Sequence, residues 1–146
     1  MKYCIRIAED RDHEVLLAIM KEHALYEEHE LEYTSCHQQL KQMNTLPITI
    51  FVVDSSGELL GYMSVIKQFS SWDMDWYLYL DCLYLNKVAR GQGIGQALME
   101  ALKQYAQENQ LKQIQWQTPI DNLAAIGFYQ SLNAKNKQKQ RFCWAV

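Results

Sequence analysis

The sequence lacks long apolar runs and has few basic residues. Although 49% of its 146 residues are hydrophobic, no stretch is long enough to cross a bilayer. Fourteen Lys and Arg against 17 Asp and Glu give a formal net charge of −3. Neutralising nucleic-acid phosphates requires a basic surface, so neither a membrane nor a nucleic acid is the expected partner. A small cationic partner fits this balance better.

Cysteine and histidine are scarce and scattered. The four cysteines form no Cys-x-x-Cys pair, and the four histidines form no His-x-x-x-His pair. The first residues do not resemble a secretory segment, and we expect none. We therefore expect free thiols, a cytoplasmic location and no metal site.

What the sequence does have is a glycine-rich turn between an apolar run and an amphipathic run. The turn reads Arg90-Gly91-Gln92-Gly93-Ile94-Gly95. Residues 76–85 before it predict a buried strand, and apolar residues at helical spacing after it predict a helix. The first N–H groups of a helix have no intrahelical partner and attract anions. The turn is thus a candidate pyrophosphate site, and a tight turn without a ligand is the alternative.

The whole chain predicts one α/β domain over residues 1–146, with a mixed, mostly antiparallel, twisted sheet and helices on both faces. Strands are expected at 4–7, 48–53, 59–69, 76–85, 113–118 and 140–146. Helices are expected from Asp10 or Asp12 to Glu28, from Thr34 or Ser35 to before Pro47, from Ile94 to Tyr105, and from Asp121 or Asn122 to Leu132. The first helix should turn inward Val15, Leu16, Ile19, Met20 and His23. Residues 69–75 predict a loop, and Asn133 can take the left-handed conformation.

These features resemble the GCN5-related N-acetyltransferase (GNAT) superfamily over almost the full length of the chain. Arg90, Gly93 and Gly95 match its Arg-x-x-Gly-x-Gly signature, which grips the pyrophosphate of acetyl-coenzyme A in that family. Asn122 and the Phe128-Tyr129 pair match its second signature. The resemblance implies the GNAT fold, acetyl-CoA as cosubstrate and no metal.

The chain is more closely similar to the diamine and polyamine branch, the spermidine/spermine acetyltransferases. The similarity lies in residues 5–8, 24–27, 69–72 and 79–81. It implies direct acetyl transfer, in a ternary complex, to a primary amine of a small diamine or polyamine. The chain departs from the branch at Asp81, Cys82 and Asn133, where glutamate, an acidic residue and glycine are usual. These departures bear on which amine is accepted.

Two side chains are the candidate catalytic residues. With a pKa near 10.4, only about one alkyl amine in a thousand is unprotonated at pH 7, so a proton acceptor is needed. Asp81 could take this proton through a water chain; alternatively, its carboxylate satisfies backbone donors at a strand bulge. Tyr129 matches the family residue that donates a proton to the departing thiolate.

The resemblance also implies two sets of binding residues. The cofactor set is Leu83, Tyr84, Leu85, Arg90, Gly91, Gln92, Gly93, Ile94, Gly95, Gln96, Asn122 and Ala125, with Leu83 and Leu85 acting through backbone N–H groups. The substrate set is Tyr26, Glu27, Trp72, Asp81, Cys82, Gln115, Trp116 and Gln117. The acidic stretch 27–32, with Asp73 and Asp75, could add to the amine site or be a solvated surface.

Other functions stay open at this point. A protein or amino-acid N-acetyltransferase is the main alternative, and a non-catalytic acyl-CoA-binding module is another. A relay through acetylated Cys82 is disfavoured because the sequence places no histidine base with it. The resemblance also leads us to expect a homodimer.

Overall fold

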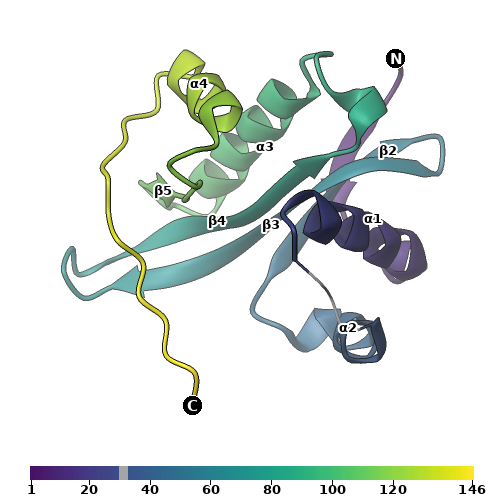
Figure 1. The fold of residues 1–146 in the computed structure, drawn as a ribbon, viewed down its shortest axis with the longest axis horizontal. Coiled ribbons are helices and arrows are strands. Elements are labelled where there is room, and N and C mark those ends of the chain that lie inside the picture. The colour runs from purple at the N-terminus through teal and green to yellow at the C-terminus, as the bar shows by residue number, and fades with distance from the viewer. Residues whose placement is uncertain (30–32) are drawn as a thin grey trace. The chain divides into compact units, whose positions relative to one another are not determined.

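The computed structural model describes residues 1–29 and 33–146 (Figure 1). Their contacts divide the chain into two compact units, Met1–Trp116 and Gln117–Val146. The expectation of one domain over residues 1–146 stays a prediction, and the two units are described one at a time.

The first unit is built on a five-stranded sheet with the order β1-β2-β3-β4-β5. Its strands are β1 (Cys4–Ile7), β2 (Thr49–Ser55), β3 (Glu58–Ser70), β4 (Asp75–Leu85) and β5 (Ile114–Gln115). All neighbouring pairs are antiparallel except β4 and β5, which are parallel. The predicted mixed, mostly antiparallel α/β fold is therefore confirmed.

Helices cover both faces of this sheet, as predicted (Figure 1). On one face, α1 (His13–Tyr26) and α2 (Tyr33–Lys41) enclose a core with alternate residues of β2 and β3, such as Val52 and Tyr62. On the other face, α3 (Ile94–Glu108) carries Tyr105, whose ring meets Phe51 edge-on at 5.2 Å between centroids. The two periodicities, 2 along β2 and 3.6 along α3, produce this layering.

Local turn chemistry explains the sharp connections. Between β2 and β3, Ser56 and Gly57 both have positive φ, 55° and 92°, as a two-residue hairpin turn requires. Strands β3 and β4 extend further than predicted, so residues 71–74 alone connect them. In α1, Val15 is exposed and Leu17 is buried, which corrects the predicted inner face.

Two expected strands are wrong in whole or part. Strand β5 is limited to Ile114–Gln115, because only Leu78 and Tyr79 of β4 pair with it. Residues 140–146 form no strand, and Phe142 and Trp144 are 87% and 95% exposed. Their alternation is typical of a half-buried strand, but a strand also requires a partner edge, which the pattern cannot supply.

The second unit contains the helix α4 (Leu123–Ser131). Asn122 is its N-cap, and its Oδ1 accepts a hydrogen bond from Ala125 N at 3.2 Å. Asn133 has a φ of 62°, so the predicted left-handed residue after the helix is confirmed.

Gly61 permits the closest approach between β3 and β4. A Cβ at this position would collide with the Tyr84 carbonyl oxygen and lie 2.6 Å from Leu85 Cδ2. We expect Gly61→Ala to lower the free energy of unfolding by about 1–3 kcal/mol, measured by urea denaturation. The matched control is Gly127→Ala, where a Cβ meets nothing within 4 Å and the helix should be unharmed. Equal stability of Gly61→Ala and the native chain would contradict this packing.

Candidate active site

The glycine turn begins α3 as the sequence predicts. Gly91 and Gly93 have φ of 73° and 77°, and a Cβ on either would meet nothing within 4 Å. Gly93 is the N-cap, and its carbonyl accepts the first helical bond from Ala97 N at 3.1 Å. The N–H groups before Ala97 in this turn are the ones that a helix leaves without an intrahelical partner. The backbone of this turn therefore suits an anion such as a pyrophosphate.

Asp81 is the extra residue of a β-bulge in β4. The register with β3 pairs Ser64 with Cys82 and Val65 with Leu80, which leaves Asp81 between them. Ser64 supports the bulge, because its Oγ accepts a hydrogen bond from Cys82 N at 3.1 Å. The Asp81 side chain is exposed, and its Oδ2 lies 3.8 Å from Cys82 Sγ. A bulge aims one side chain differently from its neighbours and is common beside active sites.

The bulge also changes which face of the sheet β4 residues occupy. Before it, Leu80 lies opposite Val65, whereas after it Tyr84 lies opposite Tyr62 in the core under α1. In a regular strand, residues 80 and 84 would share a face. Cys82 and Tyr84 therefore reach the α1 side only because Asp81 is inserted.

Beyond Tyr79, β4 has no further β5 partner among the described residues. Asn86 N donates to Leu60 O of β3 at 2.9 Å, so the preceding residue, Leu85, points its N–H and carbonyl away from β3. Arg90 Nε donates to this Leu85 carbonyl at 2.9 Å, which agrees with that direction. Leu83 and Leu85 therefore direct their backbone groups to an open edge, next to the glycine turn.

A polar cluster lies behind the bulge, on the α1 side. His23 Nδ1 lies 2.6 Å from the Tyr62 hydroxyl, and the His23 ring stacks on Tyr84 at 4.8 Å between centroids. The Tyr62 hydroxyl in turn contacts the Cys82 thiol. Helical spacing predicts His23 on the inner face of the first helix without indicating a role for it, and the predicted site residues do not include Tyr62. Polar side chains at inward-facing positions of α1 and β3 were the available signal.

Burial is the main influence on the titration of this cluster. Burial lowers the pKa of His23; Arg90 lowers it further, whereas Glu27 and Asp81 oppose the shift. Burial raises the pKa of the Tyr62 hydroxyl and of the Cys82 thiol, and the Asp81 carboxylate raises both further. Cys82 therefore stays protonated and is a weak nucleophile. His23 contacts Tyr62, which lies between it and Cys82, but the raised pKa of the Cys82 thiol still disfavours an acetyl-cysteine relay.

Several predicted site residues lie together around the end of α1. The Arg90 guanidinium carbon lies 4.6 Å from the Tyr26 ring centroid and 5.4 Å from that of Tyr84. Glu27, which follows α1, lies 4.0 Å from His23 Nε2. The predicted acidic stretch continues to residues 30–32, which lie outside the described residues.

Other predicted site residues lie elsewhere. Trp72 is 93% exposed at the β3–β4 turn, roughly 20 Å along β4 from Asp81 at about 3.3 Å per residue. Gln115 in β5 pairs with Tyr79, and Trp116 ends the first unit. Gln117 begins the second unit. The roles given to these residues stay predictions.

Two predicted site residues of the second unit, Tyr129 and Ala125, lie on α4. Burial raises the pKa of the Tyr129 hydroxyl, which favours its protonated form. The Ala125 N–H already bonds to the Asn122 side chain, which competes with its predicted contact to the cofactor. Their roles, too, stay predictions.

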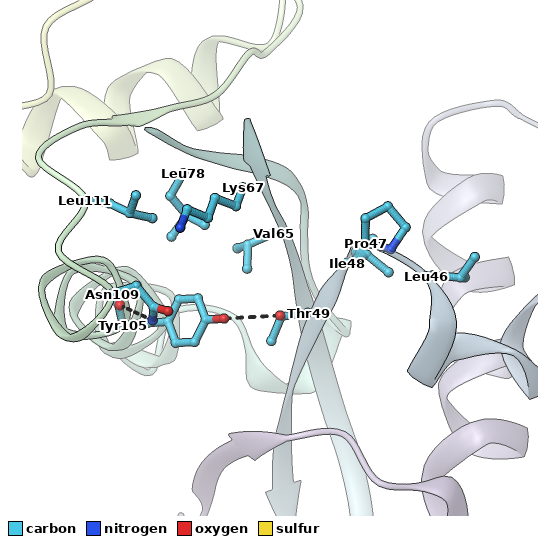
Figure 2. Close-up of a pocket in the computed structure, with 10 residues that line it drawn as sticks. All are labelled: Leu46, Pro47, Ile48, Thr49, Val65, Lys67, Leu78, Tyr105, Asn109 and Leu111. Atoms are coloured by element: carbon cyan, nitrogen blue, oxygen red, sulfur yellow. Dashed lines mark hydrogen bonds between the residues drawn. The ribbon is translucent and has the colours of Figure 1, made fainter. Parts of the chain in front are cut away.

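A hollow of about 300 Å³ lies apart from these residues, between the later part of α3 and the sheet (Figure 2). Within it, the Tyr105 hydroxyl lies 3.2 Å from Thr49 Oγ1. It shares no residue with the predicted site; its lining is Leu46, Pro47, Ile48, Thr49, Val65, Lys67, Leu78, Tyr105, Asn109 and Leu111. None of the predicted catalytic, cofactor-binding or substrate-binding residues therefore lines this hollow.

No group of three or more His, Cys, Asp or Glu side chains in the described part of the chain could hold a metal ion. Within residues 1–29 and 33–146, every helix is too short or too polar to span a membrane.

Three features lie close together along this α/β chain: a carboxylate on a bulge, an open strand edge, and a glycine turn at the start of a helix. Together they suit a long, phosphate-bearing ligand. Comparison with known proteins agrees, because the acetyltransferase (GNAT) family matches residues 16–134. The chain belongs to this family.

One curated protein is similar to part of this chain. An uncharacterized N-acetyltransferase of Bacillus subtilis strain 168, YhfO, is 32% identical over 81 residues, which cover 56% of this chain and 54% of YhfO. The aligned region thus spans about half of that relative.

Two solved structures share the fold. "A possible acetyltransferase from Clostridium difficile 630" has a TM-score of 0.86 at 18% identity, and the match covers 100% of this chain and 99% of that one. The aminoglycoside acetyltransferase meta-AAC0020 from an uncultured soil metagenomic sample, in complex with sisomicin, has a TM-score of 0.83 at 18% identity. That match covers 99% of this chain and 96% of the other.

Proposed function

We propose that this protein is an acetyl-CoA-dependent N-acetyltransferase that acetylates a primary amine of a small diamine or polyamine. Transfer is direct, in a ternary complex. One observation carries the proposal: Asp81 stands on a bulge that immediately precedes the open edge at Leu83 and Leu85, and the glycine turn follows. A proton acceptor, backbone donors and an anion site thus lie consecutively along residues 81–95.

Each part has a distinct task in the reaction. The turn at Gly91 and Gly93 would hold the pyrophosphate, and the backbone N–H groups of Leu83 and Leu85 would bind the thioester side of acetyl-CoA, which supplies the acetyl group. Such donors stabilise negative charge that develops on a carbonyl oxygen. Asp81 would take the proton of the acceptor ammonium, through water, before the amine attacks. Tyr129 would donate to the departing thiolate.

The electrostatics favour a cationic acceptor. Burial lowers the pKa of His23, but the carboxylates of Glu27 and Asp81 raise it from two different parts of the chain. The Glu22 carboxylate adds to the rise that burial causes in the pKa of Tyr84. The rings of Tyr26 and Tyr84 already face a guanidinium in this structure. A second ammonium on the acceptor needs either such rings or a carboxylate when it leaves water.

A substrate panel tests the acceptor class. Purified protein and acetyl-CoA would be assayed with diaminopropane, putrescine, cadaverine, spermidine and spermine, and in parallel with a lysine peptide, free amino acids and sisomicin. We expect kcat/KM to be highest for one of the diamines or polyamines. Turnover of the lysine peptide or of sisomicin alone would overturn the polyamine assignment while leaving acetyl transfer in place.

A further inference from the structure

We propose that Tyr26 and Tyr84 form an aromatic site for the distal cationic centre of the acceptor, and that Arg90 fills this site until coenzyme A binds. The inference rests on the proposed function and adds an order to it: the coenzyme prepares the site for the amine.

The structure shows an organic cation in this position, the guanidinium of the chain's own Arg90. Its central carbon lies 4.6 Å from the Tyr26 centroid and 5.4 Å from the Tyr84 centroid, within the range of cation–π attraction. The two rings lie 6.2 Å apart and are tilted by 56°, so they present two faces to one cation. The positive charge of Arg90 also lowers the pKa of the Tyr84 hydroxyl, against the larger rise caused by burial.

Carboxylates near the two rings make their surroundings negative, and these carboxylates lie on or next to α1 and on β4. Glu22 on α1 acts on the Tyr84 hydroxyl, and Glu27 at the end of α1 acts on the adjacent His23. From β4, Asp81 also acts on His23. The positive charge of Arg90 opposes these carboxylates: it lowers the pKa of His23 and of Tyr84, and it lies over the Tyr26 ring. A ligand with two cationic centres could place one over the rings and the other near Asp81.

Arg90 cannot bind a pyrophosphate and cover the two rings at the same time. It begins the glycine turn, where the family signature uses its charge for the pyrophosphate, yet here its Nε bonds to Leu85 O on the open edge of β4. When a pyrophosphate draws the guanidinium toward the turn, the Leu85 carbonyl and both rings become free. Coenzyme binding therefore increases affinity for the amine, and by thermodynamic linkage the amine increases affinity for the coenzyme by the same factor.

Calorimetric titration of spermidine tests this exchange. Coenzyme A without the acetyl group is used, so that no turnover occurs. We expect saturating coenzyme A to lower the spermidine Kd of the native chain by roughly tenfold, the scale of a cation–π contact. Arg90→Ala should bind spermidine without coenzyme A as tightly as the native complex does, and coenzyme A should then add nothing. Tyr26→Ala should weaken spermidine binding when coenzyme A is present and change it little when coenzyme A is absent, because Arg90 then covers the ring.

Lys87→Ala is the matched control, because it removes an exposed positive charge three residues earlier and leaves the rings covered. It should retain the coupling seen in the native chain. A spermidine Kd that coenzyme A leaves unchanged, or an equal gain in Arg90→Ala and Lys87→Ala, would overturn the exchange even if the enzyme acetylates spermidine. Failure to bind coenzyme A and to acetylate any amine would instead overturn the proposed function.

Discussion

Replacing Asp81 by asparagine is expected to lower kcat for the acceptor amine by about 10²–10³-fold at pH 7, the usual contribution of a general base. The side chain is exposed, so the substitution should leave the fold intact. Asparagine has nearly the same shape as aspartate but cannot accept the ammonium proton. Steady-state acetylation kinetics, with circular dichroism to check folding, would measure the effect.

The pH profile separates a lost base from a damaged site. Below the amine pKa of about 10.4, the free-amine fraction rises tenfold for each pH unit. The rate of Asp81→Asn should therefore climb about tenfold per unit between pH 7 and 9 and approach that of the native chain. Glu58→Gln, which changes an exposed carboxylate at the start of β3, is the control and should keep native kinetics. A rate for Asp81→Asn within twofold of native at pH 7 would refute the role of Asp81.

Replacing Arg6 by methionine is expected to lower the free energy of unfolding by about 3 kcal/mol, because it leaves a buried carboxylate without its partner. Arg6 donates to both Asp12 oxygens, at 2.7 and 2.9 Å, and to Asp54 Oδ2 at 2.8 and 3.0 Å. The Asp12 side chain is only 7% exposed. Because Asp12 also accepts from Glu9 N and Asp54 from Gly57 N, Arg6 joins β1 to the start of α1 and to the β2–β3 turn.

The surface pair of Arg11 and Glu9 provides the control for this loss. Arg11→Met breaks a contact of 2.7 Å between side chains that are 67% and 56% exposed, so it should cost less than about 1 kcal/mol. Urea denaturation would compare the two variants. Equal losses for Arg6→Met and Arg11→Met would contradict the account of Arg6.

The same network has a predicted pH dependence. The Arg6 guanidinium holds the pKa of Asp12 and of Asp54 below the usual value of each. A lowered carboxyl pKa stabilises the fold fully above the unfolded pKa of about 3.9, and this stabilisation is lost as the pH falls through the folded value. The melting temperature of Arg6→Met should therefore change less than that of the native chain between pH 5 and 2.

Local chemistry made part of this structure predictable. The positive φ of Gly93 at the start of α3, the Asn122 cap and the left-handed Asn133 each depend on residues within one turn. The strand before the glycine turn was recognisable from its aromatic, apolar run. These features need no knowledge of distant partners.

Long-range pairing determined the rest. An acidic residue in an apolar strand raised a bulge at Asp81 as one alternative, but the bulge depends on the register shift between β3 and β4 at Ser64 and Val65, which neither strand's own sequence determines. The contact between His23 and Tyr62 joins residues 39 positions apart. The tail around Trp144 shows the opposite error, since its alternation predicts a strand although no described strand pairs with it.

If the open edge of β4 supports acetyl transfer to a cationic amine, one reaction must yield both products together, and measuring both is the most direct test. Purified protein is mixed with acetyl-CoA and spermidine, and free coenzyme A thiol and acetylated spermidine are measured together. We expect thiol to appear only when the amine is present, and in an amount equal to that of the acetylated product. Thiol release without amine, or coenzyme binding with no acetylated product from any amine, would contradict it.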